Sequence, residues 1–230
     1  MFTINQRFGF LDQLASMVIN GETPSLIVTG EGGLGKTHAV RQAITSADLI
    51  EGEDFVFIKG YSTARGLYNC LYDNNGRLIV FDDCDSVLED KVALNLLKSA
   101  LDTYEKRTIN WMAKIARGDE YPDRFDFTGR IIFISNKSKE SMNEALLTRS
   151  LTVDLSMTPE DKIQRMTSIL SSILPEYNME AKYDALSFLN EVKNEVSLNL
   201  RMLIMVIKMR NSYPQNWRDM ARYMVRSCLL

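Results

Sequence analysis

The residues Gly30 to Thr37 read GEGGLGKT, and their types and spacing could hold a phosphate chain. A Gly, four residues and then Gly-Lys-Thr is the pattern of a phosphate-binding loop. Glycines let the backbone bend so that successive N–H groups point at phosphate oxygens, at the positive end of the following helix. The ammonium of Lys36 would reach the β- and γ-phosphates, and the hydroxyl of Thr37 would ligate Mg²⁺. The motif therefore predicts a nucleotide site.

The predicted nucleotide contacts comprise this loop and the residue after it: Gly30, Glu31, Gly32, Gly33, Leu34, Gly35, Lys36, Thr37 and His38. The apolar run from residue 25 to 29 predicts a strand before the loop, and residues 38–44 predict a helix after it. A strand, a loop and a helix in this order are the context that the motif requires. The ring of His38 has no assigned role in catalysis, and we expect it to be packed or on the surface.

Two acids follow the apolar run Leu78–Phe81, which comes one strand-helix-strand crossover after the loop. Asp82 would hold the water shell of Mg²⁺, and Asp83 could polarise an attacking water. The alternative is that both acids cap the loop after a strand, where Asp is common. The catalytic interpretation is favoured because the two acids come one strand-helix-strand crossover after the phosphate loop in the sequence.

In these motifs and three further residues, the sequence resembles the AAA+ ATPases over nearly its whole length. Asn136, after the apolar run 131–134, is similar to the polar residue called sensor 1, which helps to place the water. Arg149 lies in a segment similar to that of the arginine finger, and Arg201 in one similar to sensor 2, which implies that Arg201 also contacts the nucleotide, at its γ-phosphate. The resemblance implies ATP hydrolysis with Mg²⁺, in a homo-oligomeric ring or spiral where Arg149 reaches a neighbouring subunit.

One residue departs from the family pattern. The family usually has Glu after the metal-binding Asp, whereas Asp83 is one methylene shorter. Because a water-activating carboxylate must lie within hydrogen-bond reach of its water, Asp83 leaves slow hydrolysis open.

Five buried strands are needed to position these residues, at 25–29, 55–58, 78–81, 131–134 and 151–154. They alternate with helices expected at 5–19, 38–47, 62–72 and 91–104, which predicts a mostly parallel sheet between helices. Strand 55–58 is expected to be buried on both faces, and Val92 to lie on the apolar side of its helix. From residue 158 only helical periodicity remains, at 159–174, 182–196, 199–209 and 217–228. We therefore predict an α/β nucleotide-binding core over 1–157 and an α-helical lid over 158–230.

The bulk composition fits this organisation. The chain has 230 residues with a formal net charge of −3, which argues against a uniformly basic nucleic-acid coat. Its three cysteines, Cys70, Cys84 and Cys228, are widely spaced, as expected in a reducing compartment. No apolar run approaches the roughly 18 residues needed to span a bilayer. We expect a cytosolic protein without a membrane partner.

Two segments are candidates for contact with a substrate. Tyr61 follows the second strand, where AAA+ rings place a pore loop, or it packs against the neighbouring helix. Residues 106–130 interleave basic and aromatic side chains, which suits single-stranded nucleic acid, although four acids reduce the local charge.

Two functions remain open. The resemblance to small phage-encoded AAA+ ATPases, seen in Phe81-Asp-Asp-Cys-Asp-Ser86, favours DNA metabolism, with single-stranded or duplex DNA or a replication protein as partner. The alternative is an ATP-dependent switch or protein remodeller that hydrolyses slowly and does not contact nucleic acid.

Overall fold

The computed structural model describes residues 2–60, 63–103, 106–111 and 121–227. Its contacts divide the chain into two compact units. The first, called here the α/β unit, comprises Phe8–Glu31 and Lys36–Ser156. The second, called the helical unit, comprises Met1–Arg7, Gly32–Gly35 and Met157–Leu230.

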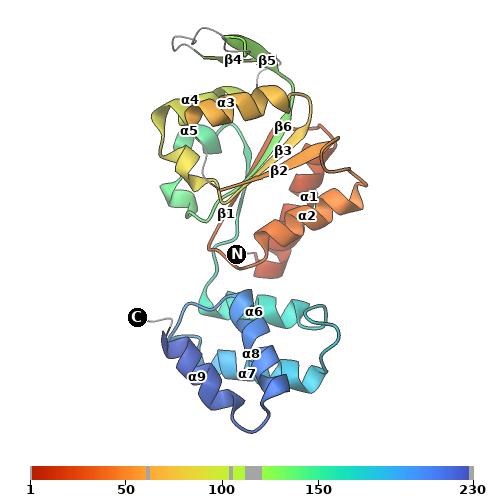
Figure 1. The fold of residues 1–230 in the computed structure, drawn as a ribbon, viewed down its shortest axis with the longest axis vertical. Helices are drawn as coiled ribbons and strands as arrows, with labels where there is room; N and C mark the ends of the chain where they lie inside the picture. Colours follow the sequence, from red (N-terminus) through yellow and green to blue (C-terminus); the bar gives the residue numbers. More distant parts are fainter. Residues whose placement is uncertain (1, 61–62, 104–105, 112–120, 228–230) are drawn as a thin grey trace. The chain divides into compact units, whose positions relative to one another are not determined.

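A five-stranded parallel sheet forms the centre of the α/β unit (Figure 1), as predicted. The strand order is β2-β3-β6-β1-β7. The strands are β1 (Ser25–Thr29), β2 (Phe55–Lys59), β3 (Leu78–Asp82), β6 (Arg130–Ile134) and β7 (Leu151–Asp154). Because β1, β3 and β6 are adjacent and parallel, their carboxyl ends lie together at one edge of the sheet.

Helices cover both faces of this sheet (Figure 1). One face carries α1 (Ile4–Ile19) and α2 (Lys36–Ser46), and the other α3 (Ala64–Asp73), α4 (Lys91–Ala100) and α5 (Glu144–Leu147). Side chains of one strand alternate between the faces, so Ile79, Phe81 and Phe133 join the core under α3 and α4. Two short 3₁₀ turns complete the unit, η1 (Asp85–Leu88) and η2 (Lys139–Ser141).

Two expectations about burial were wrong. Strand β2 lies at the edge of the sheet and is only partly buried after Phe55, because its outer side has no strand partner. Val92 is 53% exposed, since it lies in the first turn of α4 beside the capping residue Asp90, away from the buried Ala93 and Leu96. Helix α4 also ends at Ala100, earlier than expected.

A hairpin that the sequence pattern did not predict precedes β6. Strand β4 (Arg107–Asn110) pairs antiparallel with β5 (Arg124–Phe127). The aromatic rings of this region pack on one another and on α3, and the hydroxyl of Tyr68 donates to the carbonyl of Pro122 at 2.6 Å. The ring contacts join Tyr68 with Trp111 and Phe125, and Tyr72 with Tyr121 and Phe125. These rings serve to anchor the hairpin.

The helical unit contains α6 (Pro159–Ile169), α7 (Met179–Val192), α8 (Leu200–Ser212) and α9 (Trp217–Ser227). Helix α6 begins with the expected Thr158 cap and Pro159, and Asp161 completes a capping box. Helices α6 and α7 end earlier than the periodicity predicted. An apolar core that includes Phe188, Leu203 and Trp217 holds the helices together. Across the described residues of both units, no helix combines the length and apolar character needed to cross a membrane.

Candidate nucleotide-binding site

The predicted site residues meet because of strand order. Gly30 follows β1, Asp83 follows β3 and Ser135 follows β6, and β6 lies between the other two strands. Ile134 pairs with Val28 on one side and with Asp82 on the other. A crevice outside the carboxyl ends of parallel strands is where ligands bind in open α/β sheets.

The phosphate loop begins with a glycine that no other residue could replace without a shift of the backbone. Gly30 has φ 131°, and a Cβ atom built on it would lie 2.8 Å from the carbonyl carbon of Leu155. Its N–H donates to the carbonyl of Lys137 at 3.2 Å. The loop is thereby held between β7 and the segment after β6, with its backbone bent as a phosphate cradle requires.

Within the helical unit, Gly33 contacts the start of α8. Its carbonyl accepts from the N–H of Leu200 at 2.9 Å, and a Cβ atom built on Gly33 would lie 3.2 Å from the Cβ of Asn199. The tip of the loop therefore touches the helix turn that also carries Arg201.

Lys36 is buried at the centre of the polar cluster, with 4% of its surface exposed. Its ammonium donates to the carbonyls of Gly30 and Glu31, at 2.6 and 2.7 Å, and to Oδ1 of Asn136 at 3.1 Å. Burial lowers the pKa of Lys36, and the charges of four acids, Asp82, Asp83, Asp85 and Glu31, oppose that change. The ammonium is thus held by groups that it could exchange for phosphate oxygens.

Thr37 and Asp82 bring three oxygens together. The Thr37 hydroxyl lies 3.0 and 3.1 Å from the two carboxylate oxygens of Asp82, which is 2% exposed. Mg²⁺ prefers such hard oxygen ligands, usually one or two carboxylates with substrate phosphates and water. These residues fit the ion that the phosphate loop implies.

The carboxylate of Asp82 also contacts the ammonium of a lysine. The ammonium of Lys59 lies 2.8 Å from Oδ2 of Asp82, and the Lys59 side chain is 53% exposed. Lys59 ends β2 and is in register with Asp82 on β3, which explains the contact.

Asn136 joins the phosphate-loop lysine to the second acid. Its Nδ2 donates to Oδ1 of Asp83 at 2.7 Å while its Oδ1 accepts from Lys36. Asp83 has φ 56°, a left-handed conformation that is uncommon outside glycine but tolerated by Asp. This backbone conformation directs the carboxylate of Asp83 toward Asn136.

The remaining predicted residues have surroundings of their own. Arg149 donates through Nη1 to the carbonyl of Ala145 at 2.8 Å, and its Nε lies 3.6 Å from Asp102. Arg201 is exposed in the first turn of α8, and His38 is exposed on α2. Tyr61 lies outside the described residues, as do Lys114 and Arg117 of the basic segment and Cys228.

Sequence reasoning missed Lys59, Asp85 and Ser135. The hydroxyl of Ser135 and the N–H of Asn136 both donate to the carboxylate of Asp85, at 2.6 and 3.1 Å. A usable signal was present, because Asp85 is the third acid in Asp82-Asp-Cys-Asp85 and Ser135 directly precedes Asn136.

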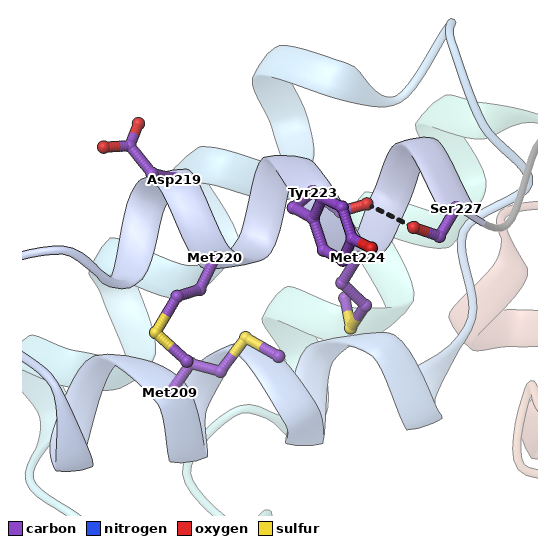
Figure 2. A pocket seen from close by; sticks show the side chains of 6 residues that line it. All are labelled: Met209, Asp219, Met220, Tyr223, Met224 and Ser227. Atoms are coloured by element: carbon purple, nitrogen blue, oxygen red, sulfur yellow. Dashed lines mark hydrogen bonds between the residues drawn. The ribbon is translucent and has the colours of Figure 1, made fainter.

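An apolar hollow of about 610 Å³ lies between α8 and α9 and contains none of the predicted site residues. Figure 2 shows the side chains of Met209, from α8, and Met220, from α9, extending into the space between the two helices. Tyr223, Met224, Asp219 and Ser227 complete its lining.

Comparison with known proteins gives one relative and several similar structures. No family model matches the chain. An uncharacterised 36.7 kDa protein from the nrdC-mobD intergenic region of Enterobacteria phage T4 is 29% identical over 238 residues, covering 95% of this chain and 73% of that protein. Domain III of the Thermotoga maritima replication initiation protein DnaA aligns with a TM-score of 0.54 at 16% identity, covering 96% of this chain and 91% of the domain.

Two longer proteins have a similar fold. A single-residue variant of Thermotoga maritima RuvB aligns with a TM-score of 0.52 at 14% identity over 90% of this chain. Brucella abortus NtrX in complex with ADP aligns with a TM-score of 0.57 at 16% identity over 89% of this chain. The chain spans 61% of the RuvB chain and 48% of the NtrX chain.

The chain has the AAA+ P-loop NTPase fold. This match rests on the parallel sheet with its flanking helices and on the C-terminal helices. Because the sequence identities are low, it concerns the fold alone. The AAA+ fold confirms the fold class expected from the sequence.

Proposed function

We propose that this chain binds ATP with Mg²⁺ and hydrolyses it to ADP and phosphate. The observation that carries the proposal is the bridge made by Asn136, which contacts Lys36 at 3.1 Å and Asp83 at 2.7 Å beside the Thr37–Asp82 pair. A phosphate ligand, a metal-ligand pair and a carboxylate for water thus lie at one sheet edge. The NtrX structures contain ADP or ATP on the same fold, which supports the choice of nucleotide.

Each residue has a role that follows from its contacts. Lys36 exchanges its two carbonyl acceptors for phosphate oxygens, and the N–H groups of the glycine loop hold the same phosphates. Thr37 and Asp82 would hold the metal ion, which when bound would neutralise charge that develops on the phosphates. Asp83 orients the attacking water and accepts its proton, and Asn136 keeps that carboxylate next to Lys36.

We further propose that the active form is a homo-oligomer, a ring or spiral in which Arg149 completes the site of a neighbouring subunit. Arg149 is 35% exposed in its side chain and is held by a backbone carbonyl and by Asp102, contacts that can be exchanged. The loop-tip contact between Gly33 and Leu200 supports a role for Arg201 in sensing the γ-phosphate, because Leu200 and Arg201 both lie at the start of α8.

We propose that the chain acts in the DNA metabolism of a phage. The T4 relative supports the source, and the similarity to a replication initiation protein supports the process, through replication, helicase or clamp loading, or recombination. On the β4–β5 hairpin, Lys106 and Arg124 are exposed while the aromatic rings are packed. Contact with single-stranded or duplex DNA through the hairpin would therefore use phosphates more than stacked bases. A replication protein is a further candidate partner.

A second candidate function is an ATP-dependent switch or remodeller with slow hydrolysis and no contact with nucleic acid. The side chain of Asp83 is one methylene shorter than Glu, and its carboxylate already accepts a hydrogen bond from Asn136. Both features restrict how far the carboxylate can move toward a water molecule. This chain would then act through ATP binding alone.

Steady-state ATP hydrolysis with and without single-stranded DNA tests the proposal, together with binding of a fluorescent ATP analogue. Lys36→Ala should weaken ATP binding about tenfold to a hundredfold, because each hydrogen bond to a charged group contributes about 1.5 to 3 kcal/mol. Lys208→Ala, at an exposed position on α8, is the matched control and should change neither quantity.

The outcomes separate the candidates. Turnover that DNA stimulates supports the first function, and tight retention of ATP with negligible turnover supports the second. Equal ATP binding by the wild type and Lys36→Ala would contradict both.

A further inference from the structure

Asp85 holds the backbone that carries Asn136. It begins η1, just after the two acids of the candidate site, and is half-buried. One carboxylate oxygen accepts from the hydroxyl of Ser135 at 2.6 Å, and the other from the N–H of Asn136 at 3.1 Å. Ser135 is completely buried, and its N–H donates to Val28 of β1 at 2.8 Å. Asp85 therefore links the turn after β3 to the end of β6.

The Ser135 hydroxyl extends this connection. Its oxygen also accepts from the N–H of Lys137 at 3.0 Å, and the carbonyl of Lys137 accepts from Gly30 at 3.2 Å. The residues after β6 are thus fixed on one side by Asp85 and on the other by the first glycine of the phosphate loop.

The orientation of the Asn136 amide follows from its two partners. Lys36 can only donate, so it takes Oδ1, and the ionised carboxylate of Asp83 can only accept, so it takes Nδ2. A side chain with two rotatable bonds satisfies both partners at once only if its own backbone is held in place. Asp85 supplies that restraint at the Asn136 N–H.

We propose that Asp85 is a positioning residue for ATP hydrolysis, acting through Asn136. This inference rests on the function proposed above. Both oxygens of Asp85 are engaged by the β6 end, so its effect passes through the placement of Asn136 and, from there, of Asp83. Removal of Asp85 leaves the Ser135 hydroxyl and the Asn136 N–H without their acceptor, and the bridge between Lys36 and Asp83 loosens.

Four variants test this inference: Asp85→Ala, Asp85→Asn, Asn136→Ala and the double variant of Asp85→Ala with Asn136→Ala. Asp85→Ala should lower turnover about tenfold to a hundredfold and change the affinity for ATP by less than about threefold, because the lost contacts are charge-assisted and do not touch the nucleotide. Asp85→Asn keeps one acceptor oxygen and should lose less. The double variant should be no slower than Asn136→Ala alone, since both changes act on one unit.

Asp90→Ala is the matched control. Asp90 also accepts two backbone N–H bonds, from Val92 and Ala93 at the start of α4, and neither donor belongs to the candidate site. Its loss should lower the melting temperature and leave turnover of the folded protein unchanged. Multiplicative losses in the double variant, or full turnover in Asp85→Ala, would overturn the proposal.

A readout without turnover separates this inference from the proposed function. The side-chain amide resonance of Asn136, assigned by its absence in Asn136→Ala, should shift or broaden in Asp85→Ala and stay in place in Asp90→Ala. An unmoved resonance would refute the role of Asp85 even if the wild type hydrolyses no ATP. A protein that does not hydrolyse ATP but shows the shift would refute only the proposed enzymatic function.

Discussion

Lys36 of the α/β unit and Lys182 of the helical unit are almost equally buried, with 4% and 1% of their surfaces exposed. Lys36 donates to two carbonyls and to Asn136, and four acids contribute their charge. Lys182 lies on α7 and donates to the carbonyl of Ser171 at 3.4 Å. The same residue type at the same depth thus has very different surroundings.

This difference shows that burial alone does not identify a functional charge. In the α/β unit, polar groups converge because three strands end side by side, and each group has partners that a ligand could replace. In the helical unit, polar contacts cap helices or join neighbouring helices, as Asn178 caps α7 and Arg210 pairs with Asp184. We therefore expect substitutions in the first unit to affect chemistry more strongly than those in the second.

The largest expected effect comes from Arg149→Ala. If Arg149 acts in a neighbouring subunit, hydrolysis should fall by about 10³-fold or more while ATP binding persists, which is the range seen for arginine fingers. Steady-state turnover and analogue binding at matched oligomer concentration measure both quantities.

Arg201→Ala is the informative comparison, because it places the same change in the helical unit. One lost charge-assisted hydrogen bond predicts a decrease of only about tenfold to a hundredfold. A larger loss from Arg201→Ala than from Arg149→Ala would break the contrast between the units. Full turnover by a monomer of verified mass would remove the role of Arg149.

An effect of intermediate size is expected on the free energy of unfolding at alkaline pH, because the α/β unit contains a buried thiol. Burial raises the pKa of Cys84 to about 11 from 9.0. The folded chain keeps this thiol protonated while the unfolded chain ionises it, so the stability is fully present below pH 9 and is lost as the pH rises toward 11. The loss should approach about 1.4 kcal/mol per pH unit in that window.

Urea unfolding of the wild type and Cys84→Ala between pH 8 and 10.5 isolates this thiol, since the titration of tyrosines and lysines is common to both proteins. The free-energy difference between them should shrink as the pH rises. A constant difference over that range would contradict the assigned protonation of Cys84.

The smallest effect is expected for Lys182→Met. A methionine keeps most of the volume of the lysine and removes a buried charge, and replacing buried charges by apolar groups is often neutral or stabilising. The free energy of unfolding should change by less than about 1 kcal/mol, and ATP binding should not change. A loss of ATP binding comparable with that of Lys36→Ala would show that depth, rather than partners, marks a functional lysine.

Much of the fold was predictable because its signals are local. The phosphate loop follows a run of five buried residues, Asp82 is the last residue of a second such run, and Asn136 follows a third, so their meeting at one sheet edge could be expected. The β4–β5 hairpin was missed because its strands are only four residues long, and the apolar alternation in β5 is limited to Phe125 and Phe127.

The less predictable parts of the site depend on register and side-chain direction. Lys59 contacts Asp82 only because β2 and β3 pair in that register, and Asp85 reaches Ser135 across 50 residues of chain. Neither relation leaves a periodic pattern. The roles of Arg149 and Arg201 depend on a neighbouring subunit and on the nucleotide, and they stay predictions.

The pairing of Lys59 with Asp82 gives the carboxylate proposed to bind the metal a tethered counter-ion. A buried carboxylate without a cation would strongly oppose folding, but here an ammonium is supplied from the adjacent strand at 2.8 Å. Binding of a divalent ion at Asp82 would then be an exchange of cations, and the displaced ammonium would belong to the residue just before Gly60. Occupancy of the proposed metal position would thereby be linked to the last residue of the edge strand.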